Sequence, residues 1–127
     1  MSIDLDVRTI PHEHQRYATV GDYVDDSFRR VHITVSCMRN WRYELLVAVH
    51  EMVEYYLCKE AKIKMEDIDA FDKTYELQRL PDDDSEPGDS VLAPYHEQHV
   101  AATRIEKFIA AELGVNWTTY DKVVNNL

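Results

Sequence analysis

Apolar and polar residues alternate in two stretches near the start of the chain. Residues 3–8 alternate Ile, Leu and Val with Asp and Arg, and residues 31–37 alternate Val, Ile and Cys with His, Thr and Ser. A period of two places every second side chain on the same face, so both stretches are expected to be strands with one face on the core. The turn signal Gly21-Asp22, followed by Tyr-Val, predicts a third short strand. We therefore expect residues 1–37 to form a small, twisted antiparallel sheet.

The period changes to that of a helix after Asn40, a residue type that commonly caps helix N-termini. Leu, Val, Met and Tyr then recur three and four residues apart on one wide face. Pro94 suits the first turn of a later helix, and Gly114 suits its C-terminal cap. Helices are predicted at residues 41–59, 65–77 and 94–113, and a short fourth helix is predicted after the cap Asn116.

A β-rich segment followed by three to four helices predicts an α+β fold and not a doubly wound sheet. The length of 127 residues fits a single domain, 1–127. In this domain a β-rich segment (1–37) precedes a helical segment (41–127). Residues 81–90 combine many acidic side chains with two prolines and a glycine, which indicates an exposed acidic loop.

The charge balance excludes some classes of partner. With 24 acidic and 14 basic residues the formal net charge is −10, which disfavours binding to the phosphates of nucleic acids. The N-terminus lacks the features of a signal peptide, and the longest aliphatic run is too short to cross a bilayer. We therefore expect a cytoplasmic protein that binds neither nucleic acid nor membrane. Cys37 and Cys58 lie in apolar contexts and are expected to be small buried side chains.

The helix at 41–59 carries the sequence His50-Glu51-Met-Val-Glu54. Residues four apart share a helix face, so His50 and Glu54 are expected about 40° apart around the helix axis. Both border the apolar face, where an unpaired charge is costly. An imidazole beside carboxylates is the ligand chemistry of zinc hydrolases. The motif therefore predicts part of a site for zinc or another divalent transition metal, with His50 and Glu54 as ligands.

His50 and Glu51 match the first half of the signature His-Glu-x-x-His, and in this the chain resembles the zincin metallopeptidases. The resemblance implies a metalloprotease-like hydrolase in which His50 binds the metal and Glu51 is the catalytic base. Glu54 stands where that family has its second His, which leaves the identity of the metal open because carboxylates also bind zinc. The strand at 31–37 precedes the helix as the substrate-pairing edge strand does in that family.

A third ligand is expected from the helix at 94–113. Its apolar residues, Phe108 among them, are taken to face the core, and His99 flanks that stripe. Glu106 lies two turns beyond His99 on nearly the same line, so it is a candidate ligand or a hydrogen-bond partner of a ligand. Asp72, on the helix at 65–77, could add a hard oxygen ligand.

Two other functions stay open. Glu51-x-x-Glu54 together with Asp69-x-x-Asp72 resembles the magnesium pattern of the MazG-like nucleotide pyrophosphohydrolases, an all-helical family, and would imply Mg²⁺. Alternatively the chain is a non-catalytic phage or partner-binding protein, in which His50 and Glu54 only hydrogen-bond within a helical interface. An acidic surface suits a basic peptide or protein partner, and aromatic residues near the C-terminus could form a homodimer contact.

Residues 42–121 also resemble small uncharacterised proteins of phages and prophages, a resemblance that implies no activity. The quoted segment includes Glu86-Pro-Gly-Asp89. This segment could fold over a cleft as a lid or form an ordinary acidic loop.

Overall fold

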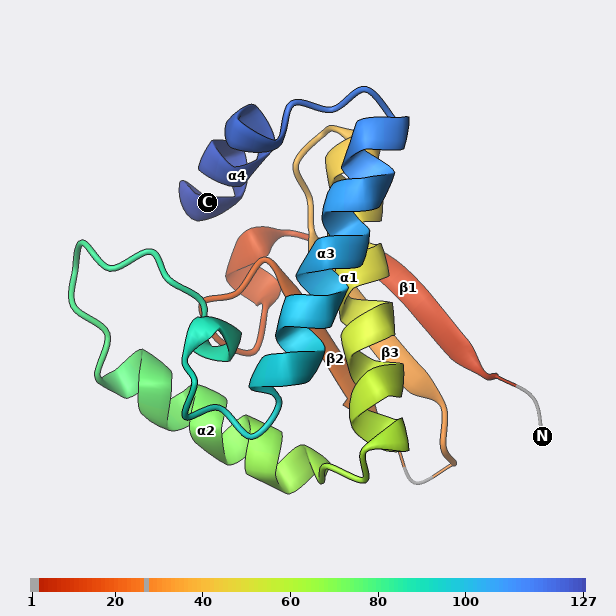
Figure 1. Ribbon diagram of the computed structural model, residues 1–127, viewed down its shortest axis with the longest axis vertical. Helices are drawn as coiled ribbons and strands as arrows, with labels where there is room; N and C mark the ends of the chain where they lie inside the picture. The colour runs from red at the N-terminus through yellow and green to blue at the C-terminus, as the bar shows by residue number, and fades with distance from the viewer. Residues whose placement is uncertain (1–2, 27) are drawn as a thin grey trace.

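The computed structural model describes residues 3–26 and 28–127 and confirms the α+β class. Three strands form one sheet near the N-terminus, and the helices follow (Figure 1). The strands are β1 (Leu5–Ile10), β2 (Gly21–Asp25) and β3 (Val31–Ser36), in the spatial order β1-β3-β2. The helices are α1 (Trp41–Glu60), α2 (Met65–Leu77), α3 (His96–Glu112) and α4 (Trp117–Asn125), with short 3-10 turns η1 (His12–His14) and η2 (Pro87–Asp89).

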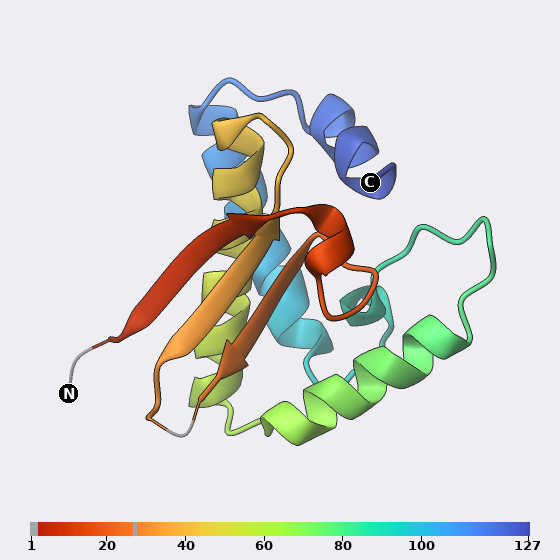
Figure 2. The ribbon, with the colours of Figure 1, turned by 180° about the vertical axis from the view of Figure 1, so that it is seen from behind.

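The sheet is mixed, which corrects the expectation of a purely antiparallel sheet. β2 and β3 pair antiparallel, but β1 and β3 pair parallel, with Leu5 opposite Val31 and Ile10 opposite Ser36. Residues 11–20 connect β1 to β2 across the end of the sheet and leave a gap between these two strands. β3, which follows β2 in the chain, fills that gap and pairs with both (Figure 2). Alternation of side chains fixes which face of a strand is buried but not the direction of its neighbour.

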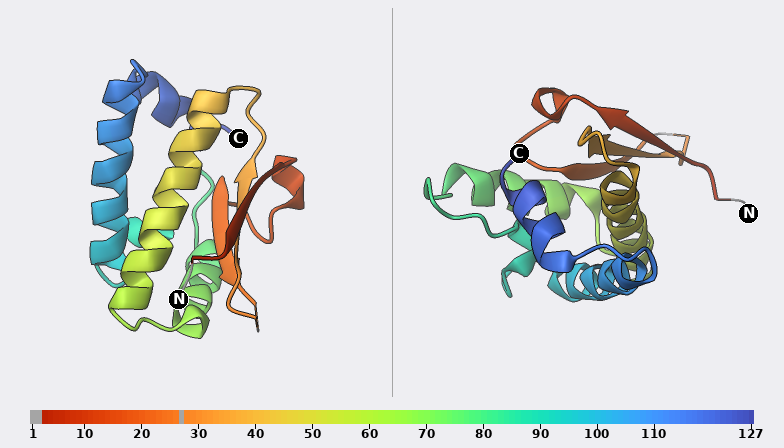
Figure 3. Two further views of the ribbon diagram at one scale, coloured as in Figure 1. Left: turned by 90° about the vertical axis from the view of Figure 1, so that its right-hand side faces the viewer. Right: turned by 90° about the horizontal axis from the view of Figure 1, so that it is seen from above.

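α1 is the central helix of the molecule. It packs against β2 and β3 on one side and against α3 on another, so α1 lies between α3 and the sheet (Figure 3). Asn40 caps α1 as expected, because its side-chain oxygen accepts the backbone N–H groups of Arg42 and Tyr43 at 3.1 and 3.3 Å. A helix covered on two sides must bury residues over much of its circumference, including those at the edge of the apolar face.

α3 buries a different stripe from the expected one. The residues of α3 that are buried are His99, Ala102, Glu106 and Ala110, whereas Phe108 is 64% exposed. The expectation that Phe108 faces the core was therefore wrong: the face of α3 that meets α1 is made of small and polar residues. Cys37 is likewise exposed, against expectation, while Cys58 is buried.

The hydrophobic core joins the sheet to all four helices, with members from Tyr23 on β2 to Tyr120 on α4. Val31, Ile33 and Val35 of the central strand are almost completely buried. Among the helices that the structure describes, none combines the length and the apolar character that crossing a membrane requires.

Removing the side chain at the centre of this sheet should destabilise the protein. Ile33 has no exposed surface, so Ile33→Ala loses buried area and leaves a cavity, and we expect the free energy of unfolding to fall by about 2–5 kcal/mol. Val7, which is 47% exposed on β1, provides the control, since Val7→Ala should change stability little. Urea unfolding measures both, and equal losses would contradict this description of the core.

Candidate metal centre

Four ionisable side chains are buried where α1 meets α3. His50 and Glu54 come from α1, one turn apart, and His99 and Glu106 come from α3, two turns apart. Each of the four is at most 7% exposed. Burial of such groups is costly unless they are paired, so the contacts among them decide whether this interface is stable.

Three ligand-type atoms converge in a small triangle. Nε2 of His50 lies 3.0 Å from Oε2 of Glu54 and 3.2 Å from Nδ1 of His99, and the third side, from His99 Nδ1 to Glu54 Oε2, measures 2.9 Å. Ligand atoms held at zinc-binding distances in a tetrahedral site are about 3.3 Å apart. The triangle therefore needs only a slight expansion to admit a cation.

Outer hydrogen bonds orient His50 and Glu54. Glu106 accepts a hydrogen bond from Nδ1 of His50 at 2.8 Å, and Tyr120 donates to the other oxygen of Glu106 at 2.6 Å. Tyr23 donates to Oε1 of Glu54 at 2.7 Å. Because an ionised carboxylate only accepts, both ring nitrogens of His50 donate when the ring is protonated. When the ring loses one proton to a metal ion, the hydrogen bond to Glu106 keeps the other on Nδ1 and leaves the lone pair of Nε2 inside the triangle.

His99 is oriented in the same way by the turn η2. Its Nε2 lies 3.1 Å from a carboxylate oxygen of Asp89 and 3.2 Å from one of Glu86. When His99 loses one proton to a metal ion, these carboxylates keep the other proton on Nε2 and leave the lone pair on Nδ1, again inside the triangle. Gly88 is buried directly against this ring, and any side chain at that position would collide with it.

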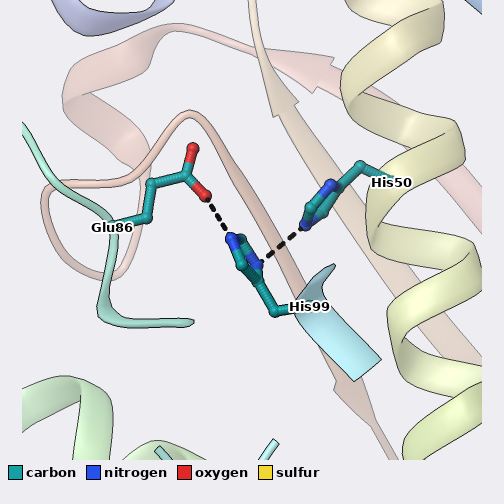
Figure 4. A group of neighbouring side chains, drawn as sticks. All are labelled: His50, Glu86 and His99. Atoms are coloured by element: carbon teal, nitrogen blue, oxygen red, sulfur yellow. Dashed lines mark hydrogen bonds and ion pairs between the residues drawn. The ribbon is translucent and has the colours of Figure 1, made fainter. Parts of the chain in front are cut away.

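Glu86 is a second carboxylate within reach of both imidazoles. Figure 4 shows it extending from the loop toward His99, on the side of that ring away from His50. One ligand atom from each of His50, Glu86 and His99 lies within 4.8 Å of the others, and this group could hold a metal ion. The sequence raised residues 86–89 only as a lid or an ordinary loop; nothing in their spacing pointed to His99, which lies ten or more residues further on.

The carboxylates hold protons on the imidazoles when no other cation is present. Burial opposes the charged form of His50, but hydrogen bonds to Glu106 and Glu54 outweigh it and raise the pKa of His50 well above its usual value. Burial also opposes charge on His99, but hydrogen bonds to Asp89 and Glu54 raise its pKa to about 10. Burial opposes ionisation of Glu54 too, yet the two imidazoles lower the pKa of Glu54 to about 2.

Glu51 lies beside the triangle and not in it. Its side chain rests against the start of β2, where a Cβ on Gly21 would come within 2.6 Å of Glu51 Oε1. No hydrogen bond joins Glu51 to another side chain in the described part of the protein, and it lines a cleft of about 840 Å³. Burial and the negative charge of Glu54 raise the pKa of Glu51 well above its usual value, which suits a group that takes up a proton.

The other candidate carboxylates are engaged elsewhere. Asp72 accepts hydrogen bonds from the hydroxyl groups of Tyr17 and Tyr95, and Asp69 is paired with Arg16 at 3.2 Å. The structure thus brings His50, Glu54, His99 and Glu106 together but directs the oxygens of Asp72 to tyrosines.

Residues 31–37 were expected to form an edge strand that pairs with substrate, but they contain β3, the central strand of the sheet. β3 pairs on both sides, so its residues cannot accept a further strand. The edge strand next to the cleft is β2, whose Gly21 and Tyr23 approach Glu51 and Glu54. A strand-pairing role for residues 31–37 is therefore wrong.

Comparisons with known proteins add no further assignment. No family model matches the chain, and neither a curated protein nor a solved structure matches it. The functional argument therefore rests on the geometry of the centre itself.

The pKa shifts predict how the stability of the metal-free protein depends on pH. Because the imidazole pKa is higher in the folded protein, protonation of His99 contributes to the free energy of unfolding. This contribution is complete below pH 6.5 and is lost as the pH rises through about 10, the pKa of His99 in the folded protein. The lowered pKa of Glu54 means that its ionised form stabilises the folded protein. This stabilisation is complete above pH 4.5 and is lost as the pH falls toward about 2. Urea unfolding in chelator should therefore show stability falling from neutral pH toward pH 10. His99→Gln should flatten this decline, and an unchanged slope would contradict the charged state of His99.

Proposed function

We propose that this protein is a metal-dependent hydrolase of the peptidase-like kind, with zinc or a similar divalent transition metal as its cofactor. The observation that carries the proposal is the convergence of His50 Nε2, His99 Nδ1 and one oxygen of Glu54, all within 3.2 Å of one another. Imidazole nitrogens together with one carboxylate form a ligand set of catalytic zinc sites.

The donor atoms favour a transition metal over magnesium. Imidazole suits zinc and its neighbours, whereas Mg²⁺ prefers oxygen ligands and water. The carboxylates of the magnesium pattern, Glu51, Glu54, Asp69 and Asp72, do not share one point: Asp69 pairs with Arg16, and Asp72 pairs with tyrosines. The sheet also fits poorly with an all-helical pyrophosphohydrolase.

Each residue of the centre has a distinct part in hydrolysis. A metal bound by His50, Glu54 and His99 would polarise the substrate carbonyl and make water a stronger nucleophile. Glu51 would accept the proton of the attacking water and deliver it to the leaving amine as the C–N bond breaks, giving a carboxylate and an amine. Glu106 and Asp89 would hold the two imidazoles with their lone pairs inward.

The cleft suits an extended substrate. β2 is an edge strand beside Glu51, and an edge strand can pair with an extended peptide. Glu86 lines the same cleft with 48% of its side chain exposed and contacts Nε2 of His99, the ring nitrogen outside the triangle.

The first test is the metal content. Protein purified without a tag should contain about one zinc or similar metal per chain, and His50→Ala should lose it. We expect His50→Ala to remain folded by circular dichroism but to lose about 1–3 kcal/mol of stability, because one oxygen of the buried Glu106 loses its donor while Tyr120 still donates to the other. His14 is exposed, and His14→Ala should keep the metal.

Metal uptake should also release protons. His50 and His99 hold protons near pH 7 in the metal-free protein, since the pKa of each is raised. Binding should therefore release about two protons, measured by calorimetry in buffers of different ionisation enthalpy.

Stoichiometric metal in His50→Ala would refute the ligand assignment. A chain without metal, unaffected by chelator, would favour the partner-binding alternative.

The second test separates binding from catalysis. Glu51→Gln should keep the metal, because Glu51 is outside the triangle, but should lower kcat for peptide cleavage by about 10²–10⁴-fold. Zinc content and cleavage of a quenched fluorescent peptide are measured on the same samples. Full activity in Glu51→Gln would exclude Glu51 as the base.

A further inference from the structure

The loop before η2, residues 81–86, forms one wall of the cleft, and most of its side chains there are acidic. Asp82 and Asp84 line the cleft and are exposed, and Glu86 lies beside them with its side chain 48% exposed. Within residues 3–26 and 28–127, no side-chain hydrogen bond or ion pair involves Asp82 or Asp84. The charges of Asp82 and Asp84 are therefore not balanced by a neighbour in this part of the protein, whereas Glu86 contacts His99.

The arginines next to the cleft are already neutralised. Arg79 binds Glu76 through two hydrogen bonds of 2.8 Å. Arg16 binds Asp22 at 2.6 Å and Asp69 at 3.2 Å. The lysines that line the cleft come from α3 and α4 and not from this loop.

A bound divalent cation would not reverse the sign of the charge at the metal centre. Glu54, Glu106 and Asp89 surround the two imidazoles at hydrogen-bond distance. With neutral imidazoles, these three carboxylates outweigh the two positive charges of the metal. A phosphate or another anionic substrate would thus meet a negative field at the centre as well as at the cleft mouth.

We propose that the cleft takes basic polypeptide segments, with Lys or Arg side chains lying against Asp82, Asp84 and Glu86 while a neighbouring peptide bond lies at the metal centre. This inference rests on the proposed function and names its substrate class. Opposite charges across a binding cleft favour the correct partner and speed its association, and like charges penalise the wrong one. The cationic side chains of the substrate would supply the neutralising charge that the loop lacks.

The test uses the zinc-loaded Glu51→Gln variant, so that binding is measured without cleavage. Fluorescently labelled peptides of one length differ only in whether the residues flanking the central bond are Lys, Ala or Glu. Fluorescence anisotropy should give the tightest Kd for the Lys peptide and the weakest for the Glu peptide. The difference should shrink as salt is added, because these charges are exposed to solvent.

A matched pair of double variants locates the effect. Asp82→Asn with Asp84→Asn should weaken binding of the Lys peptide by about three- to tenfold. Glu60→Gln with Glu112→Gln makes the same change in net charge at exposed positions outside the cleft, and it should leave the Kd unchanged.

Two outcomes would overturn the inference. Equal losses in both double variants would mean that only the net charge of the protein matters, and equal Kd values for the Lys and Glu peptides would remove the preference altogether. Cleavage of the Ala peptide by the unmodified protein tests the proposed function separately. Preferential binding of the Lys peptide without cleavage of any peptide would reject the hydrolase and keep the ligand class.

Discussion

The contact of one Glu54 oxygen with two imidazoles is the interaction on which this structure depends. Placing a carboxylate and two histidines between packed helices costs several kcal/mol per charge unless every group finds a partner. The rest of the chain supplies those partners. β2 contributes Tyr23 to Glu54, and α4 contributes Tyr120 to Glu106. Elements far apart in the sequence therefore reach their positions partly by satisfying one buried polar centre.

This dependence explains why α3 turns polar residues inward and leaves a large aromatic ring outside. A helix is usually placed by its apolar stripe, and on that basis Phe108 should be buried. The small side chains Ala102 and Ala110 instead let α3 approach α1 closely, which brings His99 and Glu106 to His50. Hydrogen bonds to charged groups are stronger than those between neutral ones, so the polar line and not the aromatic residue decides which face of the helix is buried.

The features that sequence predicted are local, and those that it missed depend on distant segments. The periods of two and 3.6 gave the strands and helices, and helical spacing placed His50 beside Glu54. The order of the strands could not be read from alternation, because both neighbours of β3 satisfy the same pattern. The contacts of Glu86 and Asp89 with His99 could not be predicted either. Gly88 has no side chain, which permits the turn η2 to lie directly against that ring, and a long acidic loop gives no local sign of such a contact.

The difference between a proton and a metal ion in the triangle follows from geometry. A proton on His50 Nε2 or on His99 Nδ1 forms a directed bond to Glu54, and with both present the two N–H groups compete for the same oxygen. A metal ion accepts all three lone pairs at once, so it relieves that competition. The carboxylates that fix the outer nitrogens are needed in either state, because they keep both lone pairs aimed inward. The same hydrogen bonds that stabilise the metal-free fold therefore prepare it to exchange protons for a metal.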